Sequence, residues 1–76
     1  MSDQQVITEL IEEKIATLQH KVADTRAIIR LYKNWQDGSP QQQRSRKKSF
    51  ENNSKILNDL EKKLLVFKQI LRRYQQ

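Results

Sequence analysis

The sequence contains no cysteine, and glycine, proline and histidine occur only once each. Without cysteine the chain can form neither a disulfide nor a thiolate metal site, and His20 alone cannot hold a metal ion. No apolar run approaches the ~18 residues that a membrane-spanning helix needs, and polar residues follow Met1 where a signal peptide would be apolar. We therefore expect a soluble, cytoplasmic protein that binds no metal and no cofactor.

The groupings of residues that enzymes use are also missing. The sequence shows no glycine-rich phosphate loop, no metal-ligand spacing and no apparent arrangement of serine, histidine and aspartate. A chain of 76 residues buries only a thin core and has no concave pocket to offer a substrate. We expect no catalytic residue and no small-molecule substrate, and we predict that the protein is not an enzyme.

A seven-residue apolar repeat in the C-terminal half is the strongest positive signal. Such a repeat keeps one side of a helix facing a partner helix. It comprises Phe50, Leu57, Leu64 and Leu71, with Asn53, Leu60, Phe67 and Tyr74 on the alternate steps of three and four residues.

A second apolar stripe runs through the N-terminal half. Steps of four and three residues trace one face of a helix. The stripe comprises Ile7, Ile11, Ile15, Leu18, Val22, Ile29 and Tyr32. Thr25 and Arg26 fall where the stripe should continue, so we expect the contact to weaken there. With Ser2 or Asp3 as a cap, this pattern predicts a helix over residues 3–36.

A connector separates the two stripes. Gly38 can adopt the left-handed conformation that follows a last helical turn, and Pro40 interrupts a helix. Residues 41–48, with the sequence QQQRSRKK, are polar and basic and have nothing apolar to bury. Ser49 followed by Glu51 favours a helix start, whereas bases are unfavourable at a helix N-terminus. We predict a flexible basic loop over 37–48 and a second helix over 49–75.

Two long helices joined by about a dozen residues most simply fold back on each other as an antiparallel hairpin. The charges agree, because folding back places acids of the first helix beside bases of the second. These are Glu9, Glu12 and Glu13 opposite Lys68, Arg72 and Arg73. The predicted fold is all-α, an antiparallel two-helix coiled-coil hairpin that completes a helical bundle by oligomerisation or with a partner. Its predicted contact residues are Ile11, Leu18, Val22, Ile29, Leu57, Leu60, Leu64, Phe67 and Leu71.

Several large apolar residues lie off both stripes, and two helices cannot cover apolar residues on both of their sides. The predicted partner interface comprises Leu31, Trp35, Leu65, Val66 and Ile70. The partner is a second copy, giving a dimer or four-helix bundle, or another protein. Asn53 has two interpretations: a polar residue in the contact that fixes register, or a solvated residue in the first turn of the second helix.

The basic run in the connector carries an alternative hypothesis. Bases neutralise phosphates and release counterions, so Arg44, Arg46, Lys47 and Lys48 are possible nucleic-acid contacts. The competing interpretation is a solvated loop.

Two families of helical assembly chaperones resemble parts of the chain. Phe50, followed by Leu60, Leu64, Phe67 and Ile70, resembles the second helix of the small hairpin co-chaperones of type III secretion needle subunits. Residues 14–18 (KIATL), 21–25 (KVADT) and 54–57 (SKIL) look like stretches of the tail-fibre assembly chaperone of T-even-type phages. Both resemblances imply a scaffold or chaperone for another protein. We predict a non-enzymatic protein–protein interaction module, an assembly adaptor or co-chaperone, with a nucleic-acid-binding hairpin as the alternative.

Overall fold

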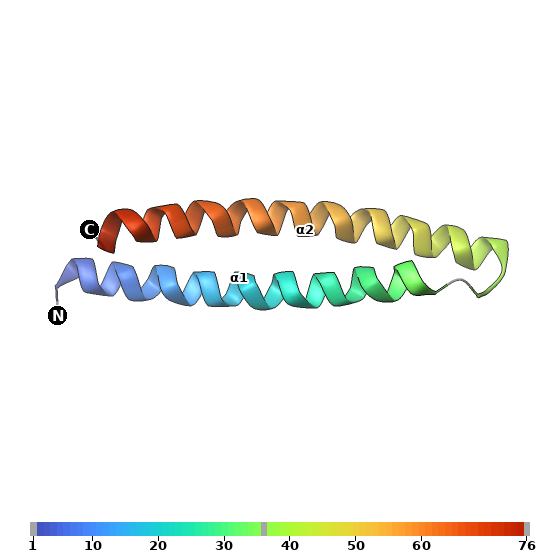
Figure 1. The fold of residues 1–76 in the computed structure, drawn as a ribbon, viewed down its shortest axis with the longest axis horizontal. Coiled ribbons are helices and arrows are strands. Elements are labelled where there is room, and N and C mark those ends of the chain that lie inside the picture. The colour runs from blue at the N-terminus through green and yellow to red at the C-terminus, as the bar shows by residue number, and fades with distance from the viewer. Residues whose placement is uncertain (1, 36, 76) are drawn as a thin grey trace.

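The computed structural model describes residues 2–35 and 37–75, which form two long helices joined by a short turn. Helix α1 spans Asp3–Asn34 and helix α2 spans Pro40–Gln75. The helices run antiparallel and side by side, with both chain ends at one end of the molecule and the turn at the other (Figure 1). At the chain ends, Gln4 Nε2 donates a hydrogen bond to the Tyr74 carbonyl at 2.6 Å. The all-α antiparallel hairpin that the sequence predicts is confirmed.

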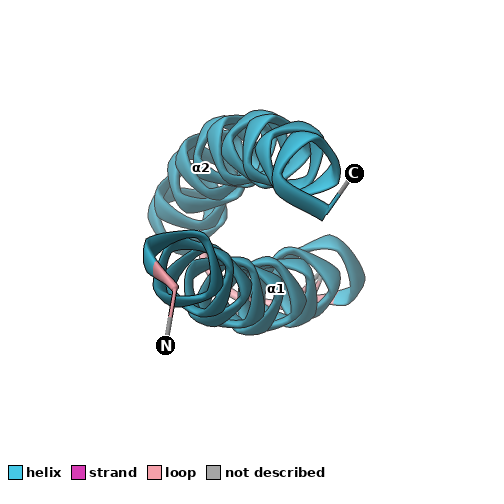
Figure 2. Cartoon of the chain, turned by 90° about the vertical axis from the view of Figure 1, so that its left-hand side faces the viewer, coloured by secondary structure: helices cyan, strands magenta, loops and turns pink. Residues whose placement is uncertain are grey.

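The two helices meet along a stripe of residues spaced by three and four, which we call the seam. In α1 its buried members are Ile11, Ile15, Leu18, Val22 and Thr25. In α2 its members are half-buried and comprise Phe50, Asn53, Leu57, Leu60, Leu64, Phe67 and Leu71. A repeat of seven is shorter than two turns of a straight helix, so helices that keep it in contact must wind around each other. Figure 2, which looks along the hairpin, shows this winding.

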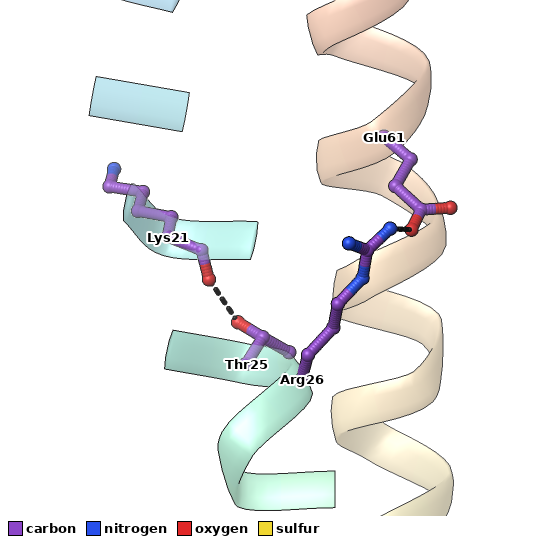
Figure 3. A network of polar contacts seen from close by, with 4 residues as sticks. All are labelled: Lys21, Thr25, Arg26 and Glu61. Carbon is purple, nitrogen blue, oxygen red and sulfur yellow. Dashed lines mark hydrogen bonds and ion pairs between the residues drawn. The ribbon is translucent and has the colours of Figure 1, made fainter. Parts of the chain in front are cut away.

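The seam in α1 departs from the predicted stripe at two places. Ile7 is 37% exposed, and the half-buried Thr8 occupies the seam position instead. Thr25 is only 8% exposed and continues the seam, so the predicted weakening at this point does not occur. Its hydroxyl donates to the Lys21 carbonyl at 2.7 Å (Figure 3). Because its own helix satisfies the hydroxyl, threonine can be buried there without an unpaired polar atom.

The second helix begins at Pro40, and the predicted loop over residues 37–48 is wrong for residues 40–48. The Gln42 backbone N–H donates to Ser39 Oγ at 3.3 Å, and the Ser39 N–H donates to Gln42 Oε1 at 3.0 Å. This reciprocal pair is a capping box, which satisfies two backbone donors at a helix start. Pro40 fits the first helical position because no intrahelical bond needs its missing N–H. The capping box outweighs the unfavourable basic charges that follow it.

The first helix ends at Asn34, and Trp35 has already left helical geometry with φ −93° and ψ 103°. The predicted end at Gln36 lies outside the described residues. Gly38 has a positive φ of +119°, as predicted, but it does not cap the first helix: Trp35 occupies the C-cap of α1, and Gly38 directly precedes Ser39 at the start of α2. A Cβ atom on Gly38 would lie 2.5 Å from Gln42 Oε1, so the capping box itself needs a glycine at this position.

Asn53 lies well inside α2, so its interpretation as a first-turn residue is wrong. It occupies the seam and is half-buried, and its Nδ2 donates to the Ser49 carbonyl at 2.8 Å. The amide is thus partnered within its own helix rather than across the seam. It resembles Thr25 in this respect.

Candidate protein-interaction surface

Each helix has one side to the left and one to the right of the seam, and an ion pair between the helices shows which of these sides lie on the same face of the hairpin. We letter each seven-residue repeat a to g, with the seam at a and d, so that Arg26 and Glu61 both occupy position e. Arg26 Nη2 lies 2.8 Å from Glu61 Oε1 and reaches it across the seam (Figure 3). Because the two e flanks meet on this side, the g flanks of both helices lie on the other.

The turn end of the hairpin supports the same assignment. Trp35, the residue after α1 and next in line for position g, borders a shallow groove together with Gln42, Ser45 and Ser49 of α2. These three residues occupy positions g and c of α2. Positions g and c of the two helices therefore form a single continuous face.

Of the ten large apolar side chains that are exposed in the described residues, seven lie on this face, and Val6, Leu65 and Tyr74 lie off it. Leu31 is 69% exposed, Leu10 59%, Trp35 58% and Val66 51%. We call the surface the apolar face. It comprises Ile7, Leu10, Ile28 and Leu31 from α1, Trp35 just beyond the end of α1, and Ile56, Val66 and the half-buried Ile70 from α2.

The predicted partner interface overlaps this face in part. Leu31, Trp35, Val66 and Ile70 belong to it, whereas Leu65 occupies position b on the flank that carries Arg26 and Glu61. The predicted interface does not include half of the apolar face. The omitted residues are Ile7, Leu10, Ile28 and Ile56. The same lettering applied to both helices would have found them, because all four fall at g or c.

Charged residues divide the apolar face into two patches. Pairs such as Gln4 with Tyr74 and Arg26 with Glu61 establish which levels of the helices lie together. The turn patch comprises Ile28, Leu31, Trp35 and Ile56, and the end patch comprises Ile7, Leu10, Val66 and Ile70. Between the patches lie Lys14, Lys21, Asp24, Asp59 and Lys63. Lys63 Nζ is 3.0 Å from Asp59 Oδ2, so these two charges are already paired within α2.

Arg46 belongs to the turn rather than to a free basic surface. Its Nη1 donates to the Trp35 carbonyl at 3.2 Å, and its Nη2 donates to the Asp37 carbonyl. Its guanidinium carbon lies 4.6 Å from the centroid of the Trp35 ring, a cation–π distance. Arg46 therefore ties the start of α2 to the end of α1.

The other predicted nucleic-acid contacts, Arg44, Lys47 and Lys48, are exposed on the first turns of α2. Lys47 lies near Lys33 of α1, and the two line the same shallow depression. One face of the Trp35 ring is occupied by Arg46, which limits base stacking at this position.

The predicted pairing of charges at the chain ends does not form. Within residues 2–35 and 37–75, the ion pairs closer than 4.0 Å are Arg26 with Glu61 and Lys63 with Asp59. The acids at the start of α1 do lie at the same end as Arg72 and Arg73, as the antiparallel arrangement requires. They contribute a favourable field there rather than direct contacts.

In the part of the chain that the structure describes, no three acidic or histidine side chains come together to hold a metal ion. Neither described helix has a stretch that is both long and apolar enough to cross a membrane. Comparison with known proteins found no matching family model, no similar curated protein and no similar solved structure. The two resemblances to assembly chaperones therefore stay predictions.

Proposed function

We propose that this hairpin is a non-enzymatic protein-interaction module, a small assembly adaptor or co-chaperone that binds protein through its apolar face. A single observation carries the proposal: the large apolar residues that the seam leaves uncovered are concentrated on one side of both helices. Exposed apolar patches of this kind, bordered by charged residues, mark contact sites in proteins.

The energetics of burial support binding through this face. Covering about five of its side chains, at ~1.5–3 kcal/mol each, would contribute ~8–15 kcal/mol before the costs of association. Those costs are of order 4–15 kcal/mol, so most of the face must take part in a stable complex. The neighbouring e flanks hold charged residues such as Arg26, Lys33 and Glu61, which favour solvent.

A pair of charge substitutions tests the proposal. Val66→Glu combined with Ile70→Glu should abolish association while the helical content is kept, because both side chains lie outside the seam. Asn58→Glu combined with Gln69→Glu is the matched control, since it adds the same charge on exposed positions away from the apolar face. Light scattering after size exclusion, with circular dichroism on the same peak, measures both properties.

Photo-crosslinking extends the test to partners other than the chain itself. A benzophenone side chain at Leu31 should form adducts with protein in an extract of the source cell, whereas one at the outward-facing Glu13 should not. If Leu31 yields no adduct with any protein, including a second copy of the chain, the proposal is wrong.

Nucleic-acid binding is the second candidate, and the helical placement of the basic run gives it a defined site. Arg44, Lys47 and Lys48 project from the first turns of α2 instead of from a flexible loop. Mobility-shift titrations at two salt concentrations test this function, because binding through phosphate contacts weakens steeply with salt. Lys47→Ser with Lys48→Ser should remove such binding. Arg46 is left unchanged in this variant because it stabilises the turn.

A further inference from the structure

The arrangement of residues along the apolar face has a near two-fold symmetry. Around Lys21 of α1, Ile7 and Trp35 each lie fourteen residues away, and Leu10 and Leu31 lie eleven and ten residues away. In α2, Ile56 and Ile70 each lie seven residues from Lys63. Each helix thus has apolar residues at similar distances on both sides of a charged centre.

The two centres lie at nearly the same level of the hairpin. Lys21 precedes Arg26 by five residues, and Lys63 follows Glu61 by two. Since the helices are antiparallel, the Arg26–Glu61 pair places the centres three residues apart, and the Gln4–Tyr74 hydrogen bond places them six residues apart in the opposite direction. The centres therefore lie within about 9 Å of each other along the axis. A two-fold axis crossing the hairpin at this level would superimpose Ile7 on Trp35, Leu10 on Leu31 and Ile56 on Ile70, while Ile28 and Val66 would face Lys14 and the neighbourhood of Asp59 in the other copy.

We infer that the apolar face binds a second copy of this chain, with the two turns at opposite ends of a four-helix bundle. In this arrangement α1 packs against α1 of the second copy, and α2 packs against α2. Leu10 then lies opposite Leu31 of the second copy, and Ile56 lies opposite Ile70 of the second copy. The inference rests on the proposed function and names its partner.

The charge distribution favours this orientation over one with both turns at the same end. Residues 26–48 hold seven bases and one acid, whereas residues 3–13 hold four acids and no base. Turns at the same end would bring two basic regions together. Turns at opposite ends bring Arg26, Arg30 and Lys33 of α1 near the acidic start of α1 in the second copy, and the basic start of α2 near Lys68, Arg72 and Arg73 of that copy. Such charges select the orientation more than they add affinity.

The size of the face matches what a stable dimer requires. The hairpin measures 59 × 16 × 14 Å, so one whole long side, which holds both apolar patches and the charged residues between them, spans about 900 Å². Specific interfaces bury about 800 Å² on each partner. A second copy would cover both patches at once.

Disulfide crosslinking tests the orientation, and the absence of native cysteine removes any background. A Leu10→Cys chain and a Leu31→Cys chain, carrying tags of different size, are mixed and oxidised. We expect a mixed disulfide between them. Either chain alone should not crosslink, because its two cysteines would lie about 31 Å apart along the bundle. Glu13→Cys mixed with Asn34→Cys, both on the outer side, is the matched control and should stay unlinked.

Two outcomes would overturn the inference. A dimer in which Leu10→Cys links to Arg73→Cys, and not to Leu31→Cys, would have its turns at the same end. A chain that stays monomeric in light scattering at high micromolar concentration would have no second copy on its apolar face. Benzophenone adducts of Leu31 with a different protein would then preserve the proposed function, and the absence of adducts would end both proposals.

Discussion

Along residues 11–25 of α1 the helices meet through buried, mostly aliphatic side chains, whereas towards the turn they meet through half-buried and polar ones. Leu18 is 2% exposed and Val22 6% exposed. Nearer the turn the seam contains Arg46, Asn53 and other residues that are only half-buried. Directional contacts hold this region: the capping box, Gly38 and the hydrogen bonds of Arg46. Burial thus supplies most of the stability, and the polar contacts determine where the second helix starts.

The largest expected loss of stability comes from a substitution in the buried part of the seam. Leu18→Ala should lower the free energy of unfolding by ~2–5 kcal/mol, because it removes the most buried side chain of the seam and leaves a cavity. Urea unfolding followed by circular dichroism, at a fixed protein concentration, measures the change. Gln19→Ala, on an exposed neighbour, is the control and should differ little from the parent. Equal stabilities of the two variants would show that burial does not dominate this region.

Gly38→Ala, in the turn, should cause the next largest loss of stability. The backbone at Gly38 has φ +119°, and an added Cβ would lie 2.5 Å from Gln42 Oε1. We expect a loss of ~1–3 kcal/mol from backbone strain and from displacement of the capping side chain. Asp37→Ala is the matched loop variant, because only its carbonyl contacts Arg46 and the substitution keeps that carbonyl. If Gly38→Ala is as stable as Asp37→Ala, the turn does not depend on glycine.

Arg46→Gln should destabilise by about 1 kcal/mol, since it removes charged donors from the Trp35 and Asp37 carbonyls. Lys47→Gln makes the same change of charge at an exposed position and should stay within about 0.5 kcal/mol of the parent. Trp35 is the only tryptophan, so its fluorescence reports on the turn directly. We expect the emission to change in the Arg46 variant alone. A matching change in the Lys47 variant would assign the effect to net charge.

The seam was predictable from the sequence because its information is local to each helix. The spacing of a residue such as Leu64 or Leu18 from its apolar neighbours is enough to predict which side of the helix it occupies. The start of α2 was also present in the sequence, as Ser39, Pro40 and Gln42. The prediction places a loop there instead, because the basic residues that follow are unfavourable at a helix N-terminus. A capping box forms specific hydrogen bonds, whereas unfavourable charges near a helix start are screened by water.

The apolar face could be predicted only in part, because its members come from two helices. Whether Val66 and Leu31 share a side depends on which flanks meet across the seam, and Arg26 with Glu61 provides that information only in three dimensions. The same holds for Arg46, whose contacts cross from α2 to the end of α1. Spacing within one helix carries no information about such contacts, so Leu65 was grouped with residues of the opposite flank.

The smallest expected effect concerns the ion pair that links the two helices. A double-mutant cycle with Arg26→Gln and Glu61→Gln should give a coupling of a few tenths of a kcal/mol, because both side chains are about half exposed. The coupling should shrink as salt is raised, since surface charges are screened. A coupling energy as large as the ~2–5 kcal/mol expected to be lost with Leu18→Ala would contradict the view that burial stabilises the hairpin more than its polar contacts do. A small, salt-sensitive coupling would mean that packing in the seam determines which sides of the two helices share a face. The ion pair would then be a consequence of that arrangement and not its cause.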